Sequence, residues 1–516
     1  MELKQRQVHL LQEGRQTYDQ FYLDEDYNVP DAKEDVRQIV RSSGTIKIED
    51  TRLSENYLKV SGKYFFRILY MTDSADASLA VLEGRIPFEE MVYVESPGGA
   101  EFYLQNVRTE FTPSLVHSRK ISLRVMVEMT AVREDFVDED VSVDVEEGGV
   151  PVYQKKRNMN LLELSITKKD TWRIKEEITL PGTKDSIGQL LFADISSRKL
   201  EIRPGNDELQ IQGELQMFCM YLSDEGKTDW LEQSIGYSGK LPCSGAEEGM
   251  FYHIRSSLAD TLADVRMDED GEMRVLGIEG TLVLHMNLYQ EKEMEILEDL
   301  YSLEQKVDYE TREAELEELL IQNHSRCKIS ERLTLPELKD DILQICSGDG
   351  TVQTEHMEQA EGGIQIEGIL HLSFLYLKAN DEMPFGSWQG MVPFSWFLEC
   401  PGINETTEIR KSISWHVEQI SINLAGNEEV EVKAVLAFDT FIRKPVKLRV
   451  IQKVECVPFS REEIEKRPGL VGYIVKEGDE LWGIAKRYMT TADAIREMNG
   501  LETERVKTGD RLLIMR

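Results

Sequence analysis

The 516-residue sequence predicts a mainly β protein, in which three tandem antiparallel β-sandwich-like repeats precede a small C-terminal βααβ domain. Three observations support this prediction. A strand pattern occurs three times, the spacing between its copies is nearly constant, and the last 46 residues change to a helical periodicity. Internal repeats decide the fold of the whole chain, so they are considered first.

The repeated strand runs from Gly62 to Tyr70, from Gly213 to Tyr221 and from Gly368 to Tyr376. In each copy, every second residue after the glycine is apolar or aromatic, whereas the residues between them include polar side chains. A period of two with one apolar face is typical of a strand that packs on a core. The apolar positions are Tyr64, Phe66, Ile68 and Tyr70, then Leu215, Met217, Cys219 and Tyr221, then Leu370, Leu372, Phe374 and Tyr376.

Other residues recur in the same register, at offsets of 151 and then 155 residues. They are Leu10, Leu161 and Leu316, then Pro30, Pro181 and Pro336, then Lys33, Lys184 and Lys339. We therefore divide the chain into repeats at 1–150, 151–306 and 307–458, a linker at 459–470 and a C-terminal domain at 471–516. The recurring lysines indicate either a shared element of the fold or a repeated contact, and tandem copies favour the first interpretation.

Within each repeat, an extended segment ends at the proline, because the residue before proline favours extended backbone. The next segment could be a helical turn or a strand. The glycine-to-tyrosine strand, a turn-rich loop and two further strand patterns follow. Short strands without long amphipathic helices predict an antiparallel sandwich or a partly open barrel. We expect the repeats to form beads on a string with weak interfaces, and a brief helix near 309–318.

The formal net charge of −35 disfavours binding to nucleic acid backbones and to anionic membranes. It indicates either simple solubility or a basic partner surface. The N-terminus has no apolar core of signal-peptide length, the six cysteines form no Cys-x-x-Cys pair, and no segment has the apolar length of a membrane helix. Because no catalytic or metal-binding motif is present, we expect a cytoplasmic, non-enzymatic protein without cofactor or metal.

The C-terminal residues predict the order strand, helix, helix, strand. Leu481, Ile484, Ala485 and Tyr488 have the spacing of an apolar helix stripe. Thr490 to Asp493 has the spacing of a capping box that opens a second helix, which Asn499-Gly500 ends. A closing strand follows the turn at Gly509-Asp510.

This segment resembles a LysM domain, through Tyr473-x-Val-x-x-Gly-Asp-x-Leu, Met498-Asn-Gly-Leu and Thr508-Gly-Asp-x-Leu. The resemblance implies a groove for N-acetylglucosamine polymers such as peptidoglycan, between two loops. The first loop holds Gly478, Asp479, Glu480 and Leu481, and the second holds Asn499, Gly500 and Leu501.

Several of these groove residues also have structural roles. Gly478, Leu481 and Asn499 are expected to build the fold whatever the domain binds. Glu480 departs from the usual Gly-Asp-Thr and would crowd the rim of the groove. Trp482 and Lys486 complete the candidate site as exposed side chains beside the loops, and Trp482 would either anchor an interface or pack on the linker.

The repeats resemble the SPOCS domain of bacterial spore-coat proteins, through Leu-Pro-x-x-Lys-x-Asp/Ser-Ile-x-Gln and Gly-x7-Tyr-Leu. Three such domains with one LysM domain resemble the SipL-like spore coat morphogenetic family. This resemblance implies a mother-cell protein at the forespore surface, which binds the coat basement ATPase SpoIVA through the LysM domain. A peptidoglycan-binding wall protein and a wall hydrolase with a LysM targeting module are the alternatives.

Overall fold

The computed structural model describes residues 2–74, 78–95, 101–146, 149–338, 342–379, 384–426, 428–460, 462 and 469–515. The first repeat contains β1 (Glu2–Asn28), β2 (Val36–Ser54), β3 (Tyr57–Thr72), β4 (Leu79–Tyr93), β5 (Glu101–His117) and β6 (Lys120–Glu146). The second contains β7 (Tyr153–Thr179), β8 (Ile187–Pro204), β9 (Glu208–Ser223), β10 (Thr228–Pro242), β11 (Phe251–Met267) and β12 (Met273–Tyr301). The third contains β13 (Gln305–Thr334), η1 (Pro336–Leu338), β14 (Ile342–Ala360), β15 (Gly363–Lys378), β16 (Phe385–Glu399), β17 (Arg410–Leu424) and β18 (Glu429–Pro458).

Each repeat forms two three-stranded antiparallel sheets. The strand orders are β1-β6-β5 and β2-β3-β4 in the first repeat, β7-β12-β11 and β8-β9-β10 in the second, and β13-β18-β17 and β14-β15-β16 in the third. The two sheets of a repeat enclose one apolar core. The predicted fold class, three β-sandwich-like repeats before a small βααβ domain, is confirmed.

The repeated strands are β3, β9 and β15, and their predicted apolar faces are buried. In the first repeat, Tyr64, Ile68 and Tyr70 are fully buried and pack against Val125 and Val127 of β6. A short turn follows each proline, which is the 3-10 helix η1 in the third repeat, and a strand then begins (β2, β8 or β14), so each of the two alternatives describes part of this segment. The brief helix expected near 309–318 is also wrong, because Ala314 and Leu316 alternate into a core as part of β13.

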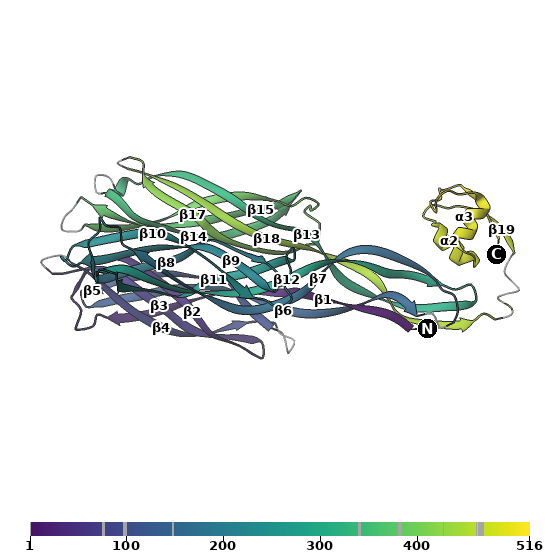
Figure 1. The fold of residues 1–516 in the computed structure, drawn as a ribbon, viewed down its shortest axis with the longest axis horizontal. Helices are drawn as coiled ribbons and strands as arrows, with labels where there is room; N and C mark the ends of the chain where they lie inside the picture. Colours follow the sequence, from purple (N-terminus) through teal and green to yellow (C-terminus); the bar gives the residue numbers. More distant parts are fainter. Residues whose placement is uncertain are drawn as a thin grey trace.

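The expectation of beads on a string is wrong, because the three repeats share apolar clusters. The reverse face of the repeated strands carries Leu69, Phe218 and Leu375, and these residues meet in one cluster with contributions from all three repeats. A second shared cluster contains the recurring leucines Leu10, Leu161 and Leu316, which are almost completely buried. The repeats therefore pack side by side as one body, as Figure 1 shows.

Three long two-stranded antiparallel ribbons extend from this body as a narrow stalk (Figure 1). The stalk consists of the paired outer parts of β1 with β6, β7 with β12, and β13 with β18, in the ranges 2–12, 135–146, 153–163, 290–301, 305–317 and 445–458. Its centre is apolar and includes Val145, Leu297, Leu300 and Ile451. The C-terminal domain lies at the far end of the stalk (Figure 1).

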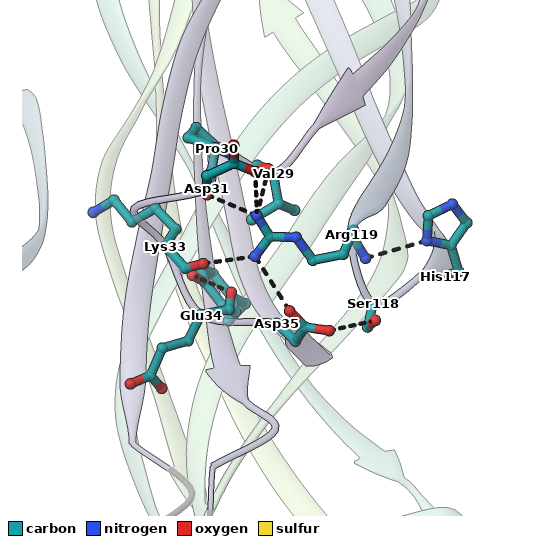
Figure 2. A network of polar contacts seen from close by, with 10 residues as sticks. Val29, Pro30, Asp31, Lys33, Glu34, Asp35, His117, Ser118 and Arg119 are labelled. Atoms are coloured by element: carbon teal, nitrogen blue, oxygen red, sulfur yellow. Dashed lines mark hydrogen bonds and ion pairs between the residues drawn. The ribbon is translucent and has the colours of Figure 1, made fainter.

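An arginine clamps the turn that contains the recurring proline and lysine (Figure 2). The Arg119 guanidinium donates to the carbonyl oxygens of Val29, Pro30 and Lys33 at 2.6–3.0 Å, and to the Asp35 carboxylate at 3.2 Å. Because the clamp uses the backbone of Lys33, the lysine position belongs to an element of the fold.

The second repeat has the same clamp, in which Arg274 donates to the carbonyl oxygens of Pro181 and Lys184. The third recurring lysine, Lys339, lies outside the described residues. In the third repeat the position that corresponds to the arginine is Glu428, whose carbonyl accepts from the backbone N–H of Leu335. The turn at the lysine position is therefore an element of the fold in the two copies whose lysines the structure describes, held through the lysine backbone.

All three repeats also line a cavity of about 3210 Å³. Five of the eight histidines line it: His253, His285, His324, His356 and His416. Arg255 bridges the first two repeats there, because it donates to Glu134 at 2.7 Å and lies over the ring of Tyr103. Burial lowers the pKa of His253 and His285 to about 3, so both imidazoles are neutral at pH 7.

Candidate partner-binding site at the C-terminal domain

The C-terminal domain consists of β19 (Leu470–Ile474), α2 (Leu481–Tyr488), α3 (Ala492–Asn499) and β20 (Arg511–Met515). The two strands are antiparallel, and the helices cover one face of the pair. The predicted helix stripe is confirmed, because Leu481, Ile484 and Ala485 are buried in the core and Tyr488 packs against it. This order matches the predicted strand, helix, helix, strand.

The second helix is capped one residue later than predicted. The hydroxyl of Thr491 accepts from the backbone N–H of Ala494, which makes Thr491 the N-cap. Thr490 is buried instead, and its hydroxyl donates to the carbonyl of Met515 in β20 at 3.1 Å. Gly500 ends the helix in the left-handed conformation, with φ of 61°, as predicted.

In the first candidate loop, Gly478 and Asp479 form a turn. Gly478 has φ of 81°, which glycine adopts without strain. The Asp479 carboxylate accepts from the hydroxyl of Tyr473 at 2.6 Å and from the backbone N–H of Lys476 at 2.9 Å. The hydrogen bond from Tyr473 is the largest cause of the lowered pKa of Asp479. These two residues therefore hold the loop in place.

The second candidate loop is also tied to the domain itself. The side-chain amide of Asn499 donates to the carbonyls of Ile495 and Leu513, and its oxygen accepts from the backbone N–H of Leu513 at 2.7 Å. Leu501 packs against the domain core. Together with buried Leu481, these residues build the fold, in agreement with the structural role expected for Gly478, Leu481 and Asn499.

Trp482 and Lys486 point out of the domain and contact the stalk. The indole N–H of Trp482 donates to Oδ2 of Asp299 at 2.8 Å, and the ammonium of Lys486 donates to Oδ1 at 2.5 Å. The hydroxyl of Tyr309 also donates to Oδ1, at 2.8 Å. Asp299 is in β12 and Tyr309 is in β13, so the second and third repeats both contribute to this contact.

An aromatic contact completes the same surface. The ring of Tyr301 meets the Trp482 ring edge to face at 4.9 Å between centroids, and its hydroxyl donates to the carbonyl of Thr490 at 2.9 Å. The ring of Tyr153 stacks on the Tyr301 ring at 5.2 Å between centroids. Among the described residues Trp482 thus packs on the second repeat, whereas most of the linker lies outside them.

Glu480 precedes the first helix but does not cap it with its side chain. Its carboxylate instead pairs with Lys155 of β7 at 2.6 Å, which is the largest cause of the raised pKa of Lys155. Nearby, burial alone would raise the pKa of Asp299, but the hydrogen bonds from Lys486 and Trp482 outweigh burial and lower it. The candidate residues on the helix side therefore form a charged and aromatic interface with the stalk.

The nine candidate residues thus fall into two groups. Gly478, Asp479, Leu481, Asn499, Gly500 and Leu501 hold the domain together, whereas Glu480, Trp482 and Lys486 contact the stalk. Sequence reasoning missed the stalk residues Tyr153, Lys155, Asp299, Tyr301 and Tyr309. A signal was available, because two facing tyrosines occupy a tip where the other repeats carry acidic pairs.

Within the described part of the chain, no three His, Cys, Asp or Glu side chains are arranged to hold a metal ion. No described helix has the length and apolar character that a membrane crossing requires.

Comparison with known families supports both resemblances. The family described as SipL, SPOCS domain matches residues 35–148, 186–266 and 341–425, together more than half of the chain, and the LysM domain family matches residues 473–514. No curated protein and no solved structure matches the chain. SPOCS and LysM are non-catalytic domain families, and their combination indicates a sporulation-related protein. The chain belongs to the SipL, SPOCS domain family and carries a C-terminal LysM domain.

Proposed function

We propose that this protein is a non-enzymatic scaffold of spore coat assembly, which binds a SpoIVA-like coat basement ATPase through its LysM domain and helps to encase the forespore. In this proposal the protein acts in the mother-cell cytoplasm, at the forespore surface. The three repeats, with the boundaries given above, form the rigid body, and the LysM domain is the docking module. Other coat proteins are further candidate partners.

One observation carries the docking role. In this structure the α2 side of the LysM domain contacts protein groups, namely a carboxylate and two tyrosines, through Trp482 and Lys486. Tryptophan is among the residues that most often anchor protein interfaces. In contrast, the polar side chains of the two candidate groove loops, Asp479 and Asn499, form hydrogen bonds within the LysM domain itself.

The position of the domain supports the same role. The LysM domain lies at the end of the stalk, away from the body of the repeats (Figure 1). Its charges are balanced, whereas the whole chain has a net charge of −35. A neutral module at the end of an acidic rod can approach an acidic or neutral protein partner with little repulsion from the body.

The test is a pull-down from sporulating cells that compares the full chain with a chain stopped at Arg467. Capture of a coat ATPase by the full chain alone supports docking through the LysM domain. Equal capture by both chains assigns docking to the repeats and refutes the proposal.

Peptidoglycan binding is the alternative, and the match to the LysM family favours it. Purified sacculi distinguish the two functions, because the scaffold proposal predicts little sedimentation of the protein with them. Strong sedimentation that is lost when the chain stops at Arg467, without capture of an ATPase, would establish glycan binding instead.

A further inference from the structure

The three two-stranded ribbons of the stalk carry different residues at equivalent positions near their ends. The outermost cross-strand pair is Glu2 with Glu146 in the first repeat, and Tyr153 with Tyr301 in the second. The third repeat carries the acidic pair Asp308 with Glu455 at the corresponding place. An aromatic pair beside Asp299 therefore distinguishes the second ribbon, formed by β7 and β12, and the LysM domain contacts that ribbon.

The contact satisfies one carboxylate with three donors. Trp482, Lys486 and Tyr309 all donate to the oxygens of Asp299, at 2.5–2.8 Å. The Lys486 ammonium also lies 5.0 Å from the centre of the Tyr309 ring, a favourable cation–π distance. Trp482 and Lys486 lie four residues apart on one face of α2, so both can donate to the same carboxylate.

The tip segment of β12 presents its two recognition groups together. Asp299 and Tyr301 are two residues apart in a strand, so both side chains point to the same side. The Tyr301 ring packs on the Trp482 ring, and the Asp299 carboxylate accepts a hydrogen bond from the indole N–H. One tryptophan therefore contacts both side chains. The surface of α2 therefore fits an extended segment in which an acidic residue is followed, two positions later, by an aromatic residue.

We propose that the α2 face of the LysM domain recognises such acidic and aromatic segments of partner proteins, and that the stalk tip of the chain itself occupies this face in competition with the partner. The competition rests on the proposed function, whereas the recognition chemistry does not. A partner that binds here must displace Asp299 and Tyr301, which lowers its apparent affinity by the fraction of chains that are open. The stalk thus restrains docking until a stronger acidic and aromatic segment arrives.

The first test uses the full chain and a labelled peptide with the sequence of residues 297–301. Asp299→Asn weakens the stalk contact and leaves Trp482 and Lys486 in place. If the stalk occupies the face nine-tenths of the time, the variant binds the peptide about tenfold more tightly than the original chain. Glu295→Gln, which changes a more exposed acid of the same strand, is the matched control and leaves binding unchanged.

Two further variants test the recognition chemistry. A peptide with asparagine in place of aspartate binds the Asp299→Asn chain at least tenfold more weakly, because Lys486 loses its charged partner. Adding Lys486→Ala to Asp299→Asn removes binding of the original peptide. Equal peptide affinity of the original chain and the Asp299→Asn chain, or binding that survives Lys486→Ala, would overturn the inference.

An independent readout follows the stalk contact without any ligand. Acylation of Lys486, measured by mass spectrometry against Lys507 of the same domain, becomes several-fold faster in Asp299→Asn if the contact restrains Lys486. An unchanged rate would mean that Asp299 does not hold the domain. If the peptide arms succeed but Asp299→Asn captures no more coat ATPase than the original chain, the stalk does not compete with that partner, whereas the proposed function itself fails only if the chain stopped at Arg467 captures as much ATPase as the full chain.

Discussion

A buried ion pair between the repeats offers a sharp test of the packing. Arg443 and Glu317 are both 1% exposed, and Nη1 of Arg443 lies 3.0 Å from Oε2 of Glu317. The same nitrogen donates to the carbonyl of Leu11 in the first repeat at 2.8 Å, and the guanidinium lies over Tyr289 of the second. The other carboxylate oxygen of Glu317, Oε1, accepts a hydrogen bond from Nη1 of Arg410 at 2.5 Å. One arginine therefore links all three repeats.

The geometry predicts that the two single substitutions differ in cost. In Glu317→Leu, Arg443 keeps its charge in a buried site without that carboxylate, and the expected loss of stability is about 3–5 kcal/mol. In Arg443→Met, Glu317 keeps its bond to Arg410, and the expected loss is about 1.5–3 kcal/mol, the usual range for one charged hydrogen bond. Removing the acid should therefore cost more than removing the base.

The repeats themselves suggest the compensated variant. Leu11 and Leu162 occupy the positions that correspond to Glu317, and both are buried. The double variant Glu317→Leu with Arg443→Met replaces the pair by apolar side chains of similar size. Such replacements are often neutral or stabilising, so the double variant should recover most of the loss caused by Glu317→Leu.

The free energies of unfolding are measured by urea titration of the original chain, the two single variants and the double variant, with tryptophan fluorescence and circular dichroism as the signals. A loss below about 1 kcal/mol for Glu317→Leu would refute the claim that Arg443 depends on this carboxylate. Additive losses in the double variant would equally refute it, because additivity means that the two side chains do not interact.

Other predictions follow from the same structure. Burial lowers the pKa of His253 to about 3, against about 6.5 when unfolded, so its neutral form stabilises the fold above pH 6.5 and this stability is lost as the pH falls toward 3. At pH 5 the loss is about 2 kcal/mol relative to pH 7, and His253→Asn should flatten this part of the urea stability profile. Leu316→Ala should cost about 2–5 kcal/mol and lower the unfolding midpoint of all three repeats together, whereas separate transitions in calorimetry would contradict their shared core. Arg119→Ala should speed amide hydrogen exchange in residues 29–35 several-fold, and unchanged exchange would show that the clamp does not restrain the turn.

Period-two patterns identified the strands and their core faces correctly, because each face is determined by residues close in the sequence. Tyr64 and Tyr70 are buried as predicted. The same pattern could not show that the repeats pack together, since Leu69 and Phe218 simply add apolar residues to the opposite face of their strands. Their mutual contact depends on where separate sandwiches meet, which no local period encodes.

The C-terminal domain shows the same boundary between local and distant information. Its helix stripe and the left-handed Gly500 follow from spacing and backbone preference, so they were predictable. The role of Trp482 was left open between an interface anchor and packing on the linker. Its contact, Asp299, lies 183 residues earlier, and only the folded stalk brings the two together.

Fusing three repeats into one chain explains why these contacts can be unequal. A symmetric trimer of identical chains must place the same residue at all three equivalent positions. In a single chain each position can change separately, so Glu317 occupies the place of Leu11 and Leu162, and the aromatic pair Tyr153 and Tyr301 occupies the place of acidic pairs in the other two repeats. The single LysM domain then contacts the second ribbon, where the carboxylate of Glu480 pairs with Lys155. The division into repeats thus creates a unique docking place on a body of nearly threefold design.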